Sequence, residues 1–234
     1  MIAPPTIAQR GQPAQLRSQA LYGRLLATAV EHVYRDGPPP PRARMRSENG
    51  HSERLPIERW VEPVDAGDTV ILAGLDGPVL DIGCGPGRHV AALRADGIAA
   101  LGVDLSPIAV WVTRERGGDA FPGSIFADVP GAGGFRTALL LDGNIGIGGD
   151  PALLLRRVRE LLAPDGVAVV ELDPPGTRTE RTRVRLEAPG VVSEWFPWAR
   201  AGVDGIGVLA EAAGLVPSAP KQAGDRWYTH LRRP

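Results

Sequence analysis

The chain has 234 residues, a net charge of −1 at neutral pH and 43% hydrophobic residues. This length and composition suffice for a single α/β domain with a full core. The near-zero charge gives no field that would favour nucleic acid or an anionic membrane, so neither is an expected partner. One cysteine excludes an intrachain disulfide, four histidines form no metal-spaced pair, and no apolar run is long enough for a bilayer. We therefore expect a cytoplasmic protein with no metal.

The N-terminal part of the chain is predicted to be helical and to precede the main domain. Residues 1–13 are rich in Pro, Gln and Ala, and we expect them to be disordered. Apolar residues recur at helical spacing over 15–35, which predicts an amphipathic helix. A proline run ends this helix, and 37–54 is interpreted as a polar connector without periodicity. Two short helices are expected next, so that 14–77 forms a helical extension or lid.

From residue 78 onward, short apolar runs alternate with helical segments. This pattern predicts parallel strands that are buried on both faces and joined by right-handed crossovers. The predicted strands are 78–82, 99–103, 123–127, 136–142 and 166–172, and the predicted helices are 88–96, 107–117 and 150–163. After residue 173 the pattern predicts a short hairpin, a helix and two closing strands. Such a terminal hairpin makes one strand of the sheet antiparallel.

The segment PVLDIGCGPGRHV carries the clearest chemical signal. A buried strand ends just after Asp81, and Gly83, Gly85 and Gly87 follow before a helix begins. Glycines let the backbone turn sharply and approach a ligand closely, and a helix N-terminus favours an anion. A dinucleotide site prefers G-x-G-x-x-G without a preceding acid, whereas Asp81 suits an ammonium group. The loop therefore predicts a ligand that carries both an amine and a carboxylate.

Two further acids follow the next two predicted strands. Asp104 ends the second strand, where a carboxylate can accept hydrogen bonds from both hydroxyls of a ribose, and Leu105 would lie against a base. Asp128 follows the third strand and can accept from an exocyclic amine, with the amide of Val129 as a donor. Three consecutive strands thus predict sites for an amino-acid end, a ribose and an adenine.

In the segments VLDIGCGPG, GVDLSP and FADVP the chain resembles class I S-adenosylmethionine-dependent methyltransferases. The resemblance covers about residues 78–173 and implies a methyltransferase domain over 78–234, with an aromatic-rich insertion at about 176–200. It implies a Rossmann-like, doubly wound and mainly parallel seven-stranded α/β sheet of order 3-2-1-4-5-7-6, with the last strand antiparallel. The cofactor implied is S-adenosyl-L-methionine, bound by Asp81, Gly83, Cys84, Gly85 and Gly87 at the methionine end, Asp104 and Leu105 at the ribose and base, and Asp128 and Val129 at the adenine.

The glycine run LLLDGNIGIGGDP follows the fourth predicted strand. It lacks the Gly-Lys-Ser/Thr of a triphosphate loop, and Asp150-Pro151 is typical of a helix start. By the resemblance, Asp142 and Asn144 line the space beside the methyl group, where Asp142 contacts the methionine ammonium or the acceptor. The glycines keep side chains out of this space, or they serve backbone geometry alone.

Candidates for catalysis and acceptor binding are few. A general base is needed only where the accepting atom keeps a proton at neutral pH. His89 is a candidate base in the first turn of the motif helix, alongside Asp142 and Asn144, and a packing histidine is the alternative. Trp195, Phe196 and Trp198 are candidates for acceptor binding, with a core role as the alternative.

These patterns favour methyl transfer from S-adenosylmethionine to a small-molecule acceptor by in-line displacement. Two alternatives stay open, namely an RNA or protein acceptor and a homologue that binds cofactor without catalysis. Asp81 and the glycine spacing disfavour a nucleotide-dependent oxidoreductase. A homodimer is compatible with the sequence.

Overall fold

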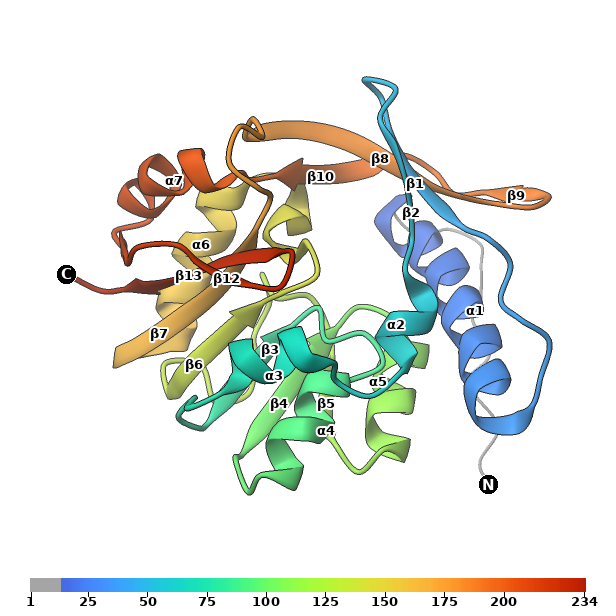
Figure 1. The fold of residues 1–234 in the computed structure, drawn as a ribbon, viewed down its shortest axis with the longest axis horizontal. Helices are drawn as coiled ribbons and strands as arrows, with labels where there is room; N and C mark the ends of the chain where they lie inside the picture. Colours follow the sequence, from blue (N-terminus) through green and yellow to red (C-terminus); the bar gives the residue numbers. More distant parts are fainter. Residues whose placement is uncertain (1–13) are drawn as a thin grey trace.

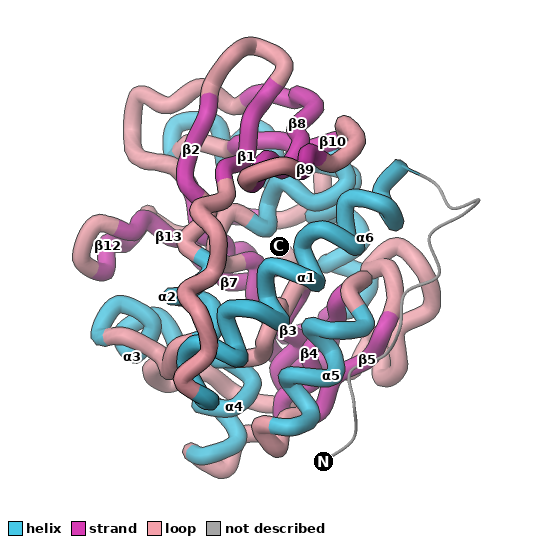
Figure 2. Tube along the Cα trace, turned by 90° about the vertical axis from the view of Figure 1, so that its right-hand side faces the viewer, coloured by secondary structure: helices cyan, strands magenta, loops and turns pink. Residues whose placement is uncertain are grey.

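The computed structural model describes residues 14–234, so the expected disorder of residues 1–13 lies outside the described residues. The chain builds a large sheet with helices on both faces and a small sheet above it (Figures 1 and 2). No helix within the described range is long and apolar enough to cross a membrane.

The large sheet has the predicted strand order. Its strands are β3 (Val79–Ile82), β4 (Ala100–Asp104), β5 (Asp119–Pro122), β6 (Phe135–Leu140), β7 (Leu162–Leu172), β11 (Val216–Pro217), β12 (Lys221–Ala223) and β13 (Arg226–Arg232). They lie in the order β11-β13-β7-β6-β3-β4-β5, and β12 pairs with β13 as an additional strand. Strands β3 to β7 are parallel, and β13 is antiparallel to β7. The order and the antiparallel last strand are confirmed.

Helices cover the large sheet because successive strand residues project to opposite faces. The helices are α3 (Ala66–Leu72), α4 (Arg88–Ala95), α5 (Pro107–Glu115), α6 (Pro151–Leu161) and α7 (Ile206–Ala212), with the short η2 (Val203–Gly205) before α7. Leu80 and Ile82 share a core with α6 and α7, whereas Val79 packs with α3 and α4. Asp150 caps α6 by accepting from the amide of Leu153 at 3.1 Å, as the Asp-Pro pair predicts.

One strand prediction was wrong. The third strand, β5, ends at Pro122, whereas 123–127 was the predicted strand. Gly123 donates to the carbonyl of Asp104, and Ala127 donates to Ser124, so this segment forms turns. Proline lacks the amide hydrogen that a ladder needs, and glycine weakens a strand, which explains the early end. The apolar pair Ile125-Phe126 mimics a strand, although Ile125 is simply part of the core.

A small sheet, of which the sequence predicted only a hairpin after residue 173, lies over the carboxyl ends of the large-sheet strands. It consists of β1 (Arg44–Ser47), β2 (Ser52–Arg54), β8 (Glu180–Ala188), β9 (Val191–Val192) and β10 (Phe196–Arg200). The order is β10-β8-β1-β2, with β9 paired to β8. The connector 37–54, interpreted as irregular, therefore supplies two strands. Its short strands carry little alternation, and β8, which pairs with β1, lies far away in the sequence.

Two N-terminal helices join the small sheet to the rest of the molecule. They are α1 (Ala14–Arg35), as predicted, and α2 (Ile57–Val61). Leu25 and Leu26 of α1 share one buried cluster with Ile108 of α5 and with Val184 and Leu186 of β8. Figure 2 shows α1 lying beside α5, below the small sheet. The burial of this apolar face fixes α1 against the domain.

We expect Gly146→Ala to destabilise the protein by about 1–3 kcal/mol, the usual cost of overpacking. Gly146 lies in η1 (Asn144–Gly149), and a Cβ there would come within 2.3 Å of the Ala199 carbonyl oxygen and 2.5 Å of Trp198 Nε1. The backbone of β10 would have to move. Urea unfolding measures the effect. Gly207→Ala is the matched control, since a Cβ there meets nothing within 4 Å. Equal stability of both variants would contradict the prediction.

Candidate active site

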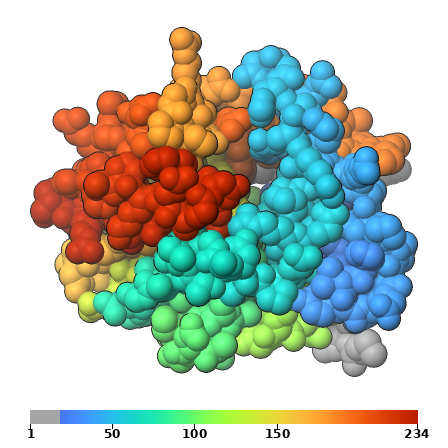
Figure 3. All heavy atoms as spheres, viewed as in Figure 1, coloured from blue at the N-terminus to red at the C-terminus, as the bar shows by residue number. Residues whose placement is uncertain are grey.

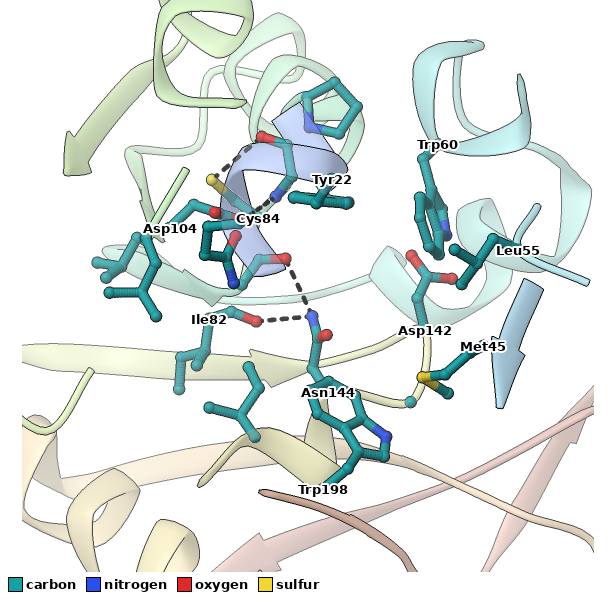
Figure 4. Close-up of a pocket in the computed structure, with 18 of the residues that line it drawn as sticks. Tyr22, Met45, Leu55, Trp60, Ile82, Cys84, Asp104, Asp142, Asn144 and Trp198 are labelled. Atoms are coloured by element: carbon teal, nitrogen blue, oxygen red, sulfur yellow. Dashed lines mark hydrogen bonds between the residues drawn. The ribbon is translucent and has the colours of Figure 1, made fainter. Parts of the chain in front are cut away.

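A cavity of about 430 Å³ lies between the large-sheet strand ends and the small sheet. In Figure 3 a recess opens at the centre of the drawn face, between the red C-terminal hairpin and the light-blue β1–β2 segment. The wall combines strand ends, helices α1 and α2, and the small sheet, and among its residues are Tyr22, Met45, Trp60, Asp104, Asn144 and Trp198 (Figure 4). This volume is typical of small-molecule sites, which span about 300–1,000 Å³.

The glycine loop forms part of the cavity floor. Gly83 and Gly85 have positive φ angles of 69° and 54°, which glycine adopts without strain. A Cβ on Gly85 would lie 3.0 Å from the Tyr22 hydroxyl, so a side chain would fill the gap between the loop and α1. Gly87 serves packing instead, because a Cβ there would meet Thr113 of α5 at 2.4 Å.

Asp104 faces the cavity from the end of β4, with Cys84 and Leu105 beside it. Its Oδ2 accepts from the amide of Gly85 at 3.0 Å, and its Oδ1 accepts from the amide of Ser106 at 2.7 Å. Burial raises the pKa of Asp104 to about 6, although both amide hydrogen bonds act to lower it. The carboxylate is therefore mostly ionised at neutral pH. Each oxygen keeps a lone pair for a ligand hydroxyl.

Asp128 and Val129 lie outside the cavity. Asp128 is exposed, and Val129 is buried in the core. Because β5 ends at Pro122, the following turn brings Ser124 and Phe126 to the cavity in their place. Because neither Asp128 nor Val129 lines the cavity, their positions do not fit the predicted contacts with the adenine. The prediction placed Asp128 directly after a strand at 123–127, whereas β5 already ends at Pro122.

His89 and Asp81 are buried beneath the cavity floor and do not line it. His89 Nε2 lies 3.1 Å from Asp68 Oδ1, and Nδ1 lies 3.5 Å from Asp81 Oδ2. Burial alone would lower the pKa of His89, but Asp68 and Asp81 raise it to about 9. A charged imidazole between two carboxylates has no lone pair for a substrate proton. His89 is thus misplaced for a general base, and Asp81 faces His89 rather than a ligand ammonium.

Arginines connect these buried acids to the cavity. Arg88 donates to both oxygens of Asp68 at 3.0 Å and to Asp142 at 2.6 and 3.0 Å. Arg226 contacts Asp68 and donates to Glu171 at 2.9 and 2.6 Å. Burial would raise the pKa of Asp68 and of Asp142, but their cationic partners hold both well below the usual range. We call Asp68, Asp81, Arg88, His89, Asp142, Glu171 and Arg226 the ion cluster.

Asp142 and Asn144 both line the cavity at the end of β6. Asp142 has a φ of 54°, which is rare for a residue with a side chain, and its amide donates to Glu171 at 2.6 Å. The Asn144 amide nitrogen donates to the carbonyls of Ile82 at 2.8 Å and Gly83 at 3.0 Å, as the dashed lines in Figure 4 mark. Asn144 therefore ties η1 to the glycine loop.

Two of the three aromatic residues predicted to bind the acceptor line the cavity. Phe196 and Trp198 alternate along β10, so both project from its inner face, and their rings form an edge contact at 6.1 Å. Trp195 precedes the strand and does not line the cavity, since its ring lies under the guanidinium of Arg185 at 4.8 Å. Since alternate residues of a strand share a face, a prediction of β10 at Phe196–Arg200 would have grouped Phe196 with Trp198 and left out Trp195.

Three cavity-lining side chains were missed by the sequence reasoning and carry buried polar atoms without a hydrogen-bond partner among residues 14–234. They are Gln19 Oε1, Arg59 Nη2 and Trp60 Nε1. The Trp60 ring contacts Tyr22 edge-on at 6.0 Å on one side of the cavity (Figure 4). An unpaired buried polar group costs about 1–3 kcal/mol and is rare in folded proteins. One acceptor and two donors therefore indicate a polar ligand.

Residues 80–170 match the family model of the methyltransferase domain. No curated protein matches the chain significantly by sequence. Among solved structures, an S-adenosylmethionine-dependent methyltransferase from Bacteroides fragilis, in complex with S-adenosyl-L-homocysteine, is 22% identical with a TM-score of 0.74. The match covers 95% of this chain and 97% of that one.

Two further structures are similar over a smaller share. The CcbJ methyltransferase from Streptomyces caelestis is 18% identical with a TM-score of 0.57, covering 74% of this chain and 92% of its own. The 1,6-didemethyltoxoflavin-N1-methyltransferase from Burkholderia thailandensis is 19% identical with a TM-score of 0.54, covering 71% and 76%. At these identities the likeness establishes the fold.

The raised pKa of His89 predicts a loss of stability at alkaline pH. Its folded value of about 9 exceeds the ordinary 6.5, so the stabilisation is complete below pH 6.5 and is lost as pH rises through 9. Urea unfolding from pH 6 to 10 should show a decline, at most about 1.4 kcal/mol per pH unit from this group. His89→Gln should flatten that decline, whereas His230→Gln, whose pKa is lowered, should not. Identical slopes for all three proteins would contradict the prediction.

Proposed function

Because this chain carries a class I S-adenosylmethionine-dependent methyltransferase domain, we propose that it methylates a small, largely apolar molecule beneath the small sheet. The observation that carries the proposal is the cavity, in which Met45, Leu186 and Trp198 of the small sheet lie opposite the glycine loop. Such a roof suits a small apolar acceptor better than a nucleic-acid strand. The name of the Burkholderia thailandensis structure describes a small-molecule acceptor as well, which supports the proposal.

The residues that line the cavity fit S-adenosylmethionine. Asp104 would accept from the ribose hydroxyls, because its oxygens keep free lone pairs. Arg59 Nη2 and Trp60 Nε1 are buried donors without a hydrogen-bond partner among the described residues, although Arg59 Nη2 lies 3.6 Å from Asp68 Oδ1. They would hold the methionine carboxylate. Gln19 Oε1, a buried acceptor in the same situation, would take an N–H or O–H of the cofactor. Because Gly85 has no side chain, the gap between the glycine loop and Tyr22 stays open for the cofactor.

When bound, the cofactor would supply an electrophilic methyl group, whose bond to sulfur would break as the accepting atom bonds to the carbon, leaving S-adenosylhomocysteine. The protein's part is to orient the reactants and exclude water. Burial, followed by the charge of Asp104, raises the pKa of Tyr22, so its hydroxyl stays protonated above the glycine loop. Asp142 is fixed by Arg88, and Asn144 holds η1 in place between the two halves of the cavity. Both define where the acceptor can lie.

The acceptor class can be tested with S-adenosylmethionine labelled on its methyl group. We expect the purified protein to transfer label to the low-molecular-mass fraction of a cell extract and not to its RNA or protein fractions. Asp104→Asn, which weakens the proposed ribose contact, is the control for cofactor-dependent labelling. Label in RNA or protein would contradict a small-molecule acceptor. Binding of S-adenosylhomocysteine without transfer to any fraction would favour the non-catalytic alternative.

The proposed carboxylate site predicts a selective loss of affinity. Trp60→Phe removes the indole donor and keeps an aromatic ring, so binding of S-adenosylhomocysteine should weaken about tenfold, the scale of one charge-assisted hydrogen bond. Methylthioadenosine lacks the amino-acid end and should bind Trp60→Phe and the unaltered protein equally. Calorimetry measures both ligands. Asp104→Asn is the matched control and should weaken both. An equal loss for the two ligands in Trp60→Phe would refute the assignment.

A further inference from the structure

Glu53 is a carboxylate in an otherwise apolar row on the inner face of the small sheet. In the strand register it lies opposite Met45 of β1, which lies opposite Leu186 of β8. Directly paired residues of antiparallel strands project from the same face. All three line the cavity, as does Trp198 of β10, and Figure 4 labels Met45 and Trp198. The acid therefore faces the space assigned to the acceptor.

Among residues 14–234, the contacts of Glu53 with His51 and Arg200 are long. Its Oε2 lies 3.4 Å from His51 Nε2 and 3.8 Å from Arg200 Nη1. Arg200 donates to that same histidine nitrogen at 2.8 Å, and since arginine cannot accept, Nε2 carries no proton. The distance to Arg200 exceeds that of a hydrogen bond. Arg200 is also held by Asp173, at 3.0 and 2.7 Å.

The other cavity acids differ from Glu53 in this respect. Asp104 accepts two backbone amides, Asp142 accepts Arg88, and Glu171 accepts Arg226. The cavity arginines also have carboxylate partners, which are Glu58 for Arg54, Asp65 for Arg59 and Asp68 for Arg88. Within the described part of the chain, Glu53 is thus the cavity carboxylate with the longest donor contacts, 3.4 Å to His51 Nε2 and 3.8 Å to Arg200 Nη1.

We propose that Glu53 binds a positively charged nitrogen of the acceptor, while the flat apolar part of the acceptor lies against Met45, Leu186 and Trp198. This inference rests on the proposed function and specifies its substrate class as planar, apolar amines. A cationic nitrogen gains a charge-assisted hydrogen bond from Glu53 and an attraction to the indole face of Trp198. An anionic acceptor of the same shape is repelled by the same carboxylate.

Three probes with one ring system separate these effects. Tryptamine, tryptophol and indoleacetate carry an ammonium, a hydroxyl and a carboxylate, respectively, on the same indole. Calorimetry in saturating S-adenosylhomocysteine should show tryptamine binding about tenfold more tightly than indoleacetate. Glu53→Gln keeps the shape and removes the charge, so it should bring the two affinities together. Glu48 lies in the same hairpin and contacts Arg183 outside the cavity, so Glu48→Gln should keep the preference for tryptamine.

The controls distinguish failure of this inference from failure of the proposed function. Binding of S-adenosylhomocysteine to Glu53→Gln, measured first, reports that the cofactor side and the fold are intact. The inference is overturned if tryptamine has no preference in the unaltered protein, if Glu53→Gln keeps the preference, or if none of the probes binds beside the cofactor product. If the unaltered protein does not bind S-adenosylhomocysteine, the proposed function itself is refuted.

Discussion

The fully buried carboxylate of Asp68 joins elements that are far apart in the sequence. It accepts from Arg88 of α4 and from Arg226 of β13, which is 158 residues away, and it contacts His89. Buried charges are tolerated only when each is paired and hydrogen-bonded. Asp68 also accepts from the backbone amide of Asp65, the N-cap residue of α3. The ion cluster therefore fixes α3 against α4 and β13. The position of the glycine loop depends on this arrangement, because that loop leads directly into α4.

The same interaction reaches the cavity through Arg88. One side of its guanidinium binds Asp68, and the other side binds Asp142, which stands in the left-handed region of backbone space. A non-glycine residue there costs of order 1–3 kcal/mol and persists only where its surroundings fix it. The two hydrogen bonds from Arg88 and the bond from the Asp142 amide to Glu171 supply that restraint. The wall of the site is therefore held by charge pairing rather than by regular secondary structure.

The sequence predicted the parts of the molecule whose determinants are local. The helix that begins at Asp150-Pro151 and the placement of Asp104 at a cavity wall each follow from a run of neighbouring residues. The strand order was instead implied by the family resemblance. Strands β1 and β2 of the small sheet were missed because β1 pairs with β8 across a long separation and both strands carry few apolar residues. Asp128 was misassigned because Pro122 ends β5 early.

His89 shows a different limit of sequence reasoning. A histidine after a glycine loop suggests a base, and only the three-dimensional approach of Asp68 and Asp81 reveals a buried cation. Arg59 Nη2 and Trp60 Nε1, which have no hydrogen-bond partner among residues 14–234, were equally hidden, since they lie on a five-residue helix that no motif marks. Buried polar groups of this kind depend on partners that the local pattern does not specify.

The methyltransferase family model covers one half of the site and not the other. Asp104, Asp142 and Asn144 lie within the matched residues 80–170, whereas Met45, Glu53, Leu186 and Trp198 lie outside them. The halves meet at η1, where Asn144 bonds the glycine loop and Gly146 packs against β10. A methyl group transfers only when donor and acceptor are closely aligned, so the reaction depends on the relative position of these two halves as well as on individual side chains. On the proposed function, substitutions in the small sheet change which molecule is accepted while the cofactor side keeps its geometry.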